Sequence, residues 1–135
     1  MEWKYVKPLV SMDSIEKFEE LVSYHFPEEF KKCIIECNGG RPIERTFDTD
    51  KVSGRELKSF LSFNMEDKET VWKLYEWLDK KVSDKYVVFA TDNFGNMICF
   101  SKIDNSINFI NHEEVDMDVE KIAKDFNEFM HILYD

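Results

Sequence analysis

His112, Glu113 and Asp92 are the residues whose types could together perform metal chemistry. Imidazole and carboxylate groups are common metal ligands, so these three residues would suit a small metal-dependent hydrolase. Adjacent residues such as His112 and Glu113, however, point in different directions. We therefore expect no metal site here and keep the hydrolase as the third of three hypotheses.

Other patterns that carry catalytic or metal chemistry are absent or incomplete. No G-x-S-x-G motif presents a nucleophile, and the spacing of His25 and His131 suggests no catalytic pair. Residues 92–96 resemble a calcium loop only superficially, because an aromatic residue takes the third position. Cys33 and Cys37 lack the second ligand pair of a zinc site, so we expect reduced core cysteines. We expect no enzyme, no cofactor and no metal.

Acidic residues crowd the segment that follows His112. The run contains no basic residue and consists of Glu113, Glu114, Asp116, Asp118 and Glu120. One interpretation is that Asp116 or Asp118 caps a helix that begins there, since carboxylates stabilise a helix N-terminus. The other is that the run, with His112, Glu28 and Glu29, forms a negative surface that binds a cationic protein. The two interpretations are compatible.

The composition favours a folded domain with a protein partner. The chain has 135 residues, of which 43% are hydrophobic, and a net charge of -10. This length is typical of one domain, so we expect residues 1–135 to form a single domain. The negative charge repels phosphate backbones and argues against a nucleic-acid partner. Because the sequence has neither a signal-peptide pattern nor a membrane-length apolar run, we expect a cytoplasmic protein without membrane association.

Apolar residues at helical spacing predict two helices in the first third of the chain. The first covers residues 13–24 and begins with a possible capping box of Asp13 and Glu16. The second begins with Pro27 as its first residue, a position that suits proline. Its stop signal is Asn38, Gly39 and Gly40.

The rest of the chain predicts strands between two further helices. Short strands are expected up to Phe63, a helix at 71–78, and an amphipathic C-terminal helix from 119 to 133. Three apolar strands between these helices are separated by two turns. The first turn contains Asp92, Gly95 and Asn96. Helices on either side of an antiparallel meander predict an α+β fold with a central antiparallel sheet.

Four segments of the chain, taken in order, resemble a known family. They are residues 26–30 leading to 38–40, residues 56–61, residues 89–100 and residues 122–129. Asn111, His112 and Glu113 add a match after the last strand of the meander. This ordered set is similar to the SUKH superfamily, the Smi/Knr-type domains of fungal cell-wall regulators and bacterial immunity proteins. Lys85, where many members have proline, departs from it, and the region 71–78 varies within it.

The resemblance implies an α+β domain without known catalytic activity. For small stand-alone bacterial members it also implies neutralisation of a cognate toxin, and many such toxins are nucleases. Our first hypothesis is therefore an immunity protein that binds and occludes a cognate, basic toxin domain through the sheet, its loops and the acidic run. The alternative is a non-catalytic regulatory scaffold or interaction module of the Smi/Knr type. We interpret Asp92, Gly95 and Asn96 as scaffold, and the oligomeric state stays open.

Overall fold

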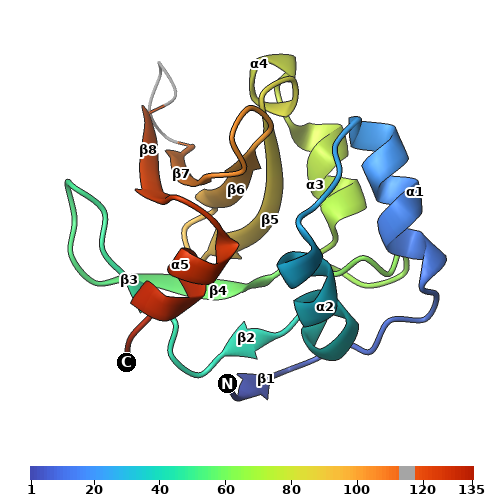
Figure 1. Ribbon diagram of the computed structural model, residues 1–135, viewed down its shortest axis with the longest axis horizontal. Coiled ribbons are helices and arrows are strands. Elements are labelled where there is room, and N and C mark those ends of the chain that lie inside the picture. The colour runs from blue at the N-terminus through green and yellow to red at the C-terminus, as the bar shows by residue number, and fades with distance from the viewer. Residues whose placement is uncertain (113–117) are drawn as a thin grey trace.

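A computed structural model describes residues 1–112 and 118–135 (Figure 1). Its helices are α1 (Asp13–Val22), α2 (Glu28–Cys37), α3 (Val71–Trp77), α4 (Lys80–Ser83) and α5 (Phe126–Ile132). Its strands are β1 (Trp3–Lys4), β2 (Arg41–Pro42), β3 (Thr46–Phe47), β4 (Arg55–Phe60), β5 (Tyr86–Asp92), β6 (Met97–Ser101), β7 (Ile107–Asn111) and β8 (Asp118–Ala123).

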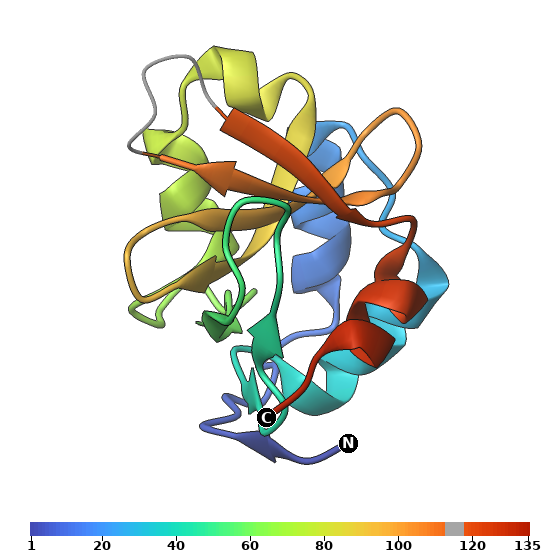
Figure 2. The same ribbon diagram turned by 90° about the vertical axis from the view of Figure 1, so that its left-hand side faces the viewer.

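An antiparallel sheet with the strand order β3-β4-β5-β6-β7-β8 organises the described part of the chain. Each of its strands pairs with the next one in the sequence, whereas β1 and β2 form a small separate sheet. The large sheet is strongly curled, and α2 and α5 lie side by side against it (Figures 1 and 2). Helix α3 packs against β5. The predicted α+β class with a central antiparallel meander is confirmed.

Phenylalanine side chains fill the space between the sheet and the helices. Eleven of the twelve phenylalanines are buried. Phe30 of α2 lies among them, with ring centroids 5.4 Å from Phe89, 5.1 Å from Phe100 and 5.2 Å from Phe126 of α5. Burial of each such ring stabilises the fold by about 1.5–3 kcal/mol. This cluster therefore fixes α2 and α5 on the sheet.

The predicted C-terminal helix is wrong in its first part. Residues 118–123 form strand β8, which pairs with β7, and α5 begins only at Phe126. The cap of α5 is Asp125, whose carboxylate accepts a hydrogen bond of 2.8 Å from the main chain of Glu128. Asp118 therefore caps no helix, and Asp116 lies outside the described residues. The apolar residues of this segment fit either period, and the free edge of β7 favours a strand.

The starts of the two N-terminal helices also differ from the prediction. The capping box does not form, because the N-cap of α1 is Met12, whose side chain makes no capping hydrogen bond. Asp13 is instead the first helical residue, and its amide donates to the Ser11 hydroxyl over 3.3 Å. Pro27 precedes α2 in an extended conformation as its N-cap rather than standing as its first helical residue.

The three cysteines are free, as predicted. Cys37 and Cys99 are buried, and Cys33 is partly buried one helical turn before Cys37 on α2. A hydrogen bond with Cys33 and burial together raise the pKa of Cys37 above its ordinary value, and burial does the same to the pKa of Cys99. The thiols of Cys37 and Cys99 therefore stay protonated at neutral pH, which suits core residues.

Candidate functional site

The buried side chain of Asn38 connects three parts of the chain. Asn38 follows the last residue of α2, and its amide nitrogen donates to the carbonyl of Lys7 over 2.7 Å and to the Ser62 hydroxyl over 3.0 Å. Its amide oxygen accepts a hydrogen bond of 2.8 Å from the main chain of Phe63. The residue that sequence patterns assigned to a helix stop thus also anchors the loop that leads to α3.

That loop and the start of α3 are held by further polar contacts. The Ser62 hydroxyl donates to the Asp67 carboxylate over 2.6 Å. Thr70 caps α3 by accepting a hydrogen bond of 3.0 Å from the main chain of Lys73. The indole N–H of Trp72 donates to the carbonyl of Phe63 over 2.9 Å. Helix α3, although only seven residues long, therefore has a fixed position beside the sheet.

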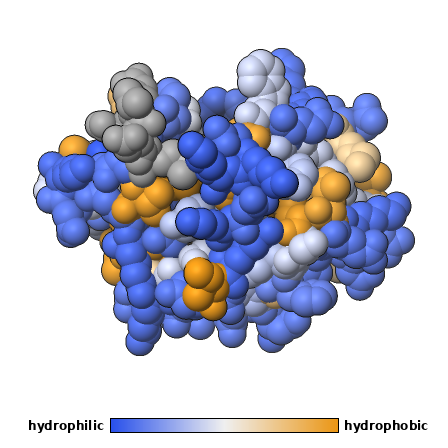
Figure 3. Space-filling model, turned by 90° about the horizontal axis from the view of Figure 1, so that it is seen from above, coloured by the Kyte–Doolittle hydropathy of each residue, from blue (hydrophilic) through white to orange (hydrophobic). Residues whose placement is uncertain are grey.

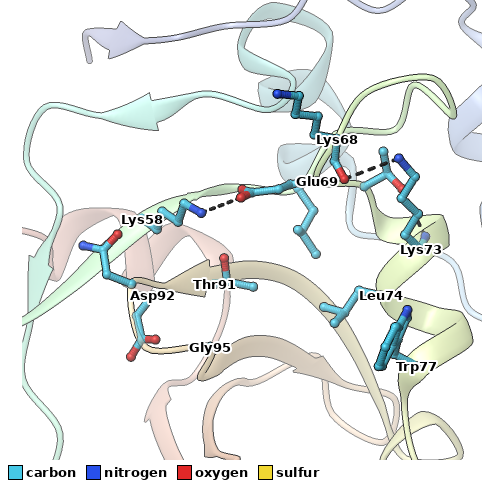
Figure 4. Close-up of a pocket in the computed structure, with 12 residues that line it drawn as sticks. Lys58, Lys68, Glu69, Lys73, Leu74, Trp77, Thr91, Asp92 and Gly95 are labelled. Carbon is cyan, nitrogen blue, oxygen red and sulfur yellow. Dashed lines mark hydrogen bonds and ion pairs between the residues drawn. The ribbon is translucent and has the colours of Figure 1, made fainter.

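A groove of about 340 Å³ runs between α3 and the ends of β4 and β5 (Figure 4). Buried Leu61 and half-buried Leu74 contribute apolar surface to it. Trp77, at the end of α3, borders the groove with 86% of its side chain exposed. Phe94 is 78% exposed and lies in the β5–β6 turn between Asn93 and Gly95, which both line the groove. Trp77 in the groove lining and Phe94 in the adjacent turn thus both face solvent.

Such exposure is unusual among the phenylalanines of this molecule. Charged and polar residues cover most of the face in Figure 3, and hydrophobic residues form small separate patches there. The other eleven phenylalanines are buried, and Phe94 is the exception. Exposed aromatic residues beside a concave surface are typical of protein-binding sites.

Lysines border the same groove. Lys58 of β4 forms an ion pair with Glu69, and both side chains point toward each other in Figure 4. The ammonium group of Lys73 donates to the carbonyls of Asp67 and Lys68 over 2.6 and 3.4 Å. Lys68 is exposed and extends away from the groove floor (Figure 4). The groove is thus richer in cations than the acidic chain as a whole.

The β5–β6 turn on the other side of the groove is tied to the end of β7. The Asp92 carboxylate accepts hydrogen bonds of 2.9 Å from the amide of Phe94 and 2.8 Å from the amide and the side chain of Asn96. The Asn96 side-chain oxygen in turn accepts from the main chain and the ring of His112, over 3.1 and 2.9 Å. Gly95, with a positive φ of 85°, lies against the His112 ring.

Asp92, one of the three residues of the hydrolase hypothesis, is engaged within its own turn. The Asp92 carboxylate is 4% exposed and serves three hydrogen bonds within its own turn. Glu113 lies outside the described residues. Within the described ranges, no group of three histidine, cysteine or acidic side chains could hold a metal ion.

Among the described residues, the structure does not bring the predicted partner-binding side chains together. Asp118 begins β8 and forms an ion pair with Lys51, whereas Glu28 and Glu29 lie in the first turn of α2. Figures 1 and 2 both show these two places well apart. His112 is exposed near the groove. Glu113, Glu114 and Asp116 lie outside the described residues.

A second hollow, of about 490 Å³, is acidic. Residues from α1, α2 and the connection between them line it, including Glu16, Glu19 and Glu20. Glu19 is buried and accepts a hydrogen bond of 2.7 Å from the amide of Phe26, while Lys31 lies 3.2 Å from its carboxylate and 3.7 Å from that of Glu28. Glu28 therefore belongs to an acidic surface over the α1–α2 corner, apart from the groove between α3 and β5.

Sequence patterns missed Trp77, Phe94 and the three lysines of the groove. One signal was present, because Phe94 is a large apolar residue inside a turn of polar residues. Trp77 follows the apolar spacing of α3 closely enough to suggest a core position. The lysines carry no pattern that separates them from other surface cations.

The described residues thus form a curled α+β domain with a groove beside α3, and exposed Trp77 is part of the groove lining. The family model of the SMI1 / KNR4 family (SUKH-1) matches residues 9–131, which is nearly the whole chain. The chain belongs to this family. Curated proteins gave no match. Among the described residues, no helix has the length and hydrophobicity that crossing a membrane requires.

Proposed function

We propose that this chain is an immunity protein that binds a cognate toxin domain and neutralises it by occlusion. The observation that carries the proposal is the groove beside α3, with exposed Trp77 in its lining and exposed Phe94 in the adjacent β5–β6 turn. Tryptophan is among the residues that dominate binding energy at protein interfaces. Members of this family act as immunity or interaction domains, and the proposal takes the first of these roles.

The walls of the groove favour tight binding because they are already ordered. Asn38, Ser62 and Thr70 hold one wall through hydrogen bonds, and Asp92 and Asn96 hold the other. Binding to an ordered surface loses less conformational entropy than binding to a loose one. The protein has no catalytic role in this proposal and acts in the cytoplasm, where a toxin would reach its target.

Net charge supports a basic toxin, such as a nuclease. The chain carries a charge of -10, and acids such as Glu16, Glu20 and Glu28 gather over the α1–α2 corner. A field of this sign speeds the approach of a cationic partner. Glu29, Asp118, Glu113, Glu114 and Asp116 add to the same field. These acids can attract a basic toxin over a distance without each of them contacting it.

Co-expression with the toxin domain of a neighbouring gene tests the proposal. The wild-type chain should restore growth and co-purify with the toxin. Trp77→Ala should weaken the complex by roughly 2 kcal/mol, as truncation of a central interface tryptophan does. Ile103→Ala is the matched control, because Ile103 is 89% exposed and does not line the groove.

The outcome also separates the two leading functions. Growth rescue by wild type and Ile103→Ala, with loss in Trp77→Ala, supports immunity through the groove. No rescue and no complex would favour a regulatory scaffold of the same family, and the partner would then be sought by an unbiased pull-down.

A further inference from the structure

We infer that the groove beside α3 recognises a partner segment in which a carboxylate side chain stands next to a large apolar one. This inference rests on the proposed function, because it names the chemistry of the toxin segment that enters the groove. The groove is the hollow of about 340 Å³ between α3 and the ends of β4 and β5.

The charges at the groove do not cancel. Of its acids, Glu69 pairs with Lys58, and the Asp92 carboxylate is buried and serves its own turn. Lys73 donates only to neutral main-chain carbonyls among the contacts of the described residues. Among the described residues, the side chain of Lys68 makes no hydrogen bond and no ion pair. Two positive charges are therefore left without a carboxylate at one place on a protein whose net charge is -10.

Apolar surface lies within reach of the same cations. Leu61, Leu74 and Trp77 line the groove together with Lys68 and Lys73. Figure 4 shows Leu74 and Trp77 on α3, where Leu74 directly follows Lys73 and Trp77 lies about one turn beyond it. An exposed ion pair alone contributes less than about 1 kcal/mol, so a carboxylate needs an apolar neighbour to bind here usefully. Burial of a leucine or aromatic side chain supplies about 1.5–3 kcal/mol more.

A protein segment fits this combination better than a nucleic acid does. Lysines beside an exposed tryptophan would suit a nucleotide, but the strongly negative chain repels an extended phosphate backbone. A peptide segment brings few charges and can place one of them at Lys68 and Lys73. The overall acidity still steers a basic toxin as a whole, because steering depends on the summed field and docking depends on local contacts.

Selection from a displayed library of random short peptides tests the inference with a defined probe. Wild-type protein should enrich peptides that combine Asp or Glu with Leu, Phe or Trp. One enriched peptide, synthesised with a fluorescent label, is then titrated against the variants by fluorescence anisotropy. Its charge-swapped form, with Lys for every Asp and Glu, serves as the control peptide.

Lys68→Glu is the decisive variant, since it reverses a charge without removing a described side-chain contact. It should weaken the enriched peptide roughly tenfold and strengthen the charge-swapped one. Trp77→Ala should weaken both. Lys32→Glu, at an exposed position of α2 outside the groove, should change neither. Enrichment of basic or uncharged peptides, or equal affinity of wild type and Lys68→Glu, overturns the inference, and so does tighter binding of single-stranded RNA than of the peptide.

The inference and the proposed function fail in different ways. If Trp77→Ala abolishes toxin neutralisation while Lys68→Glu retains it, the immunity role stands. The inference that the groove binds a carboxylate-bearing segment of the toxin is then wrong. If wild type neutralises no toxin but binds acidic peptides through Lys68, the immunity role is wrong and the groove chemistry stands.

Discussion

At the scale of single residues, this chain uses its asparagines as connectors. Asn38 joins the end of α2 to the N-terminal segment and to the loop before α3, and Asn96 joins the β5–β6 turn to His112. Sequence patterns singled out both residues, but only as local backbone signals: Asn38 as part of a helix stop and Asn96 as part of a turn. Local patterns predict the backbone geometry of such residues, and they carry no information on distant side-chain partners.

Replacement of Asn38 tests this connecting role. Asn38→Ala removes three hydrogen bonds and leaves the buried amide of Phe63 without its acceptor, because Asn38 is 1% exposed. Each buried group left unpaired costs about 1–3 kcal/mol, so we expect a loss of about 3 kcal/mol in the free energy of unfolding. Urea denaturation measures it. Asn127→Ala, at an exposed site of α5, should cost under about 0.5 kcal/mol, and equal losses would contradict the role.

The C-terminal tail offers a prediction on pH. The Tyr134 hydroxyl and the Gly54 amide donate to Asp48 over 2.6 and 2.8 Å, and these hydrogen bonds hold the pKa of Asp48 below its ordinary value of 3.8. The folded state therefore gains stability above that value and loses it as the pH falls through the lowered pKa. Tyr134→Phe removes the first-named donor, so the pKa of Asp48 should rise toward 3.8.

Carboxyl-carbon NMR titration of Asp48 in both proteins measures this change. Tyr5→Phe is the control, because Tyr5 is also exposed and makes no contact with Asp48. An unchanged Asp48 midpoint in Tyr134→Phe would refute the assignment.

At the scale of elements, the sequence predicted the meander well and the C-terminal boundary badly. Turn residues at 92–96 and 104–106 mark the hairpins of β5, β6 and β7, because turn chemistry is local. Residues 118–123 pair with β7 instead of joining α5. Their apolar spacing fits a helix, and the decision between helix and strand depends on a long-range partner that no local pattern contains.

The cap of α5 gives a measurement that distinguishes the two boundaries. Asp125→Ala removes the carboxylate that accepts from Glu128, and we expect a loss of about 1 kcal/mol in the free energy of unfolding. Asp118→Ala removes a partly exposed ion pair with Lys51 and should cost under about 0.5 kcal/mol. Thermal or urea unfolding of both variants provides the comparison. A larger loss in Asp118→Ala would restore the longer helix that spacing predicts.

At the scale of the whole molecule, the groove could not be predicted from the sequence. Its residues come from β4, from the loop before α3, from α3 itself and from the β5–β6 turn, and only the fold brings these segments together. Net charge, by contrast, is readable from the sequence without any fold. The two surfaces also differ in what they can do, because summed charge acts at a distance and the groove acts on contact.

This division predicts that two sets of variants change different rate constants of toxin binding. Glu113→Lys with Glu114→Lys reduces the negative charge of the chain, so the association rate constant should fall several-fold and depend less on salt, with little change in dissociation. Trp77→Ala should mainly raise the dissociation rate constant, as loss of a packed interface anchor does. Stopped-flow association and displacement experiments at low and high salt give both constants. If the glutamate variant dissociates faster instead, the acidic run contacts the toxin directly, and the separation of steering from docking is wrong.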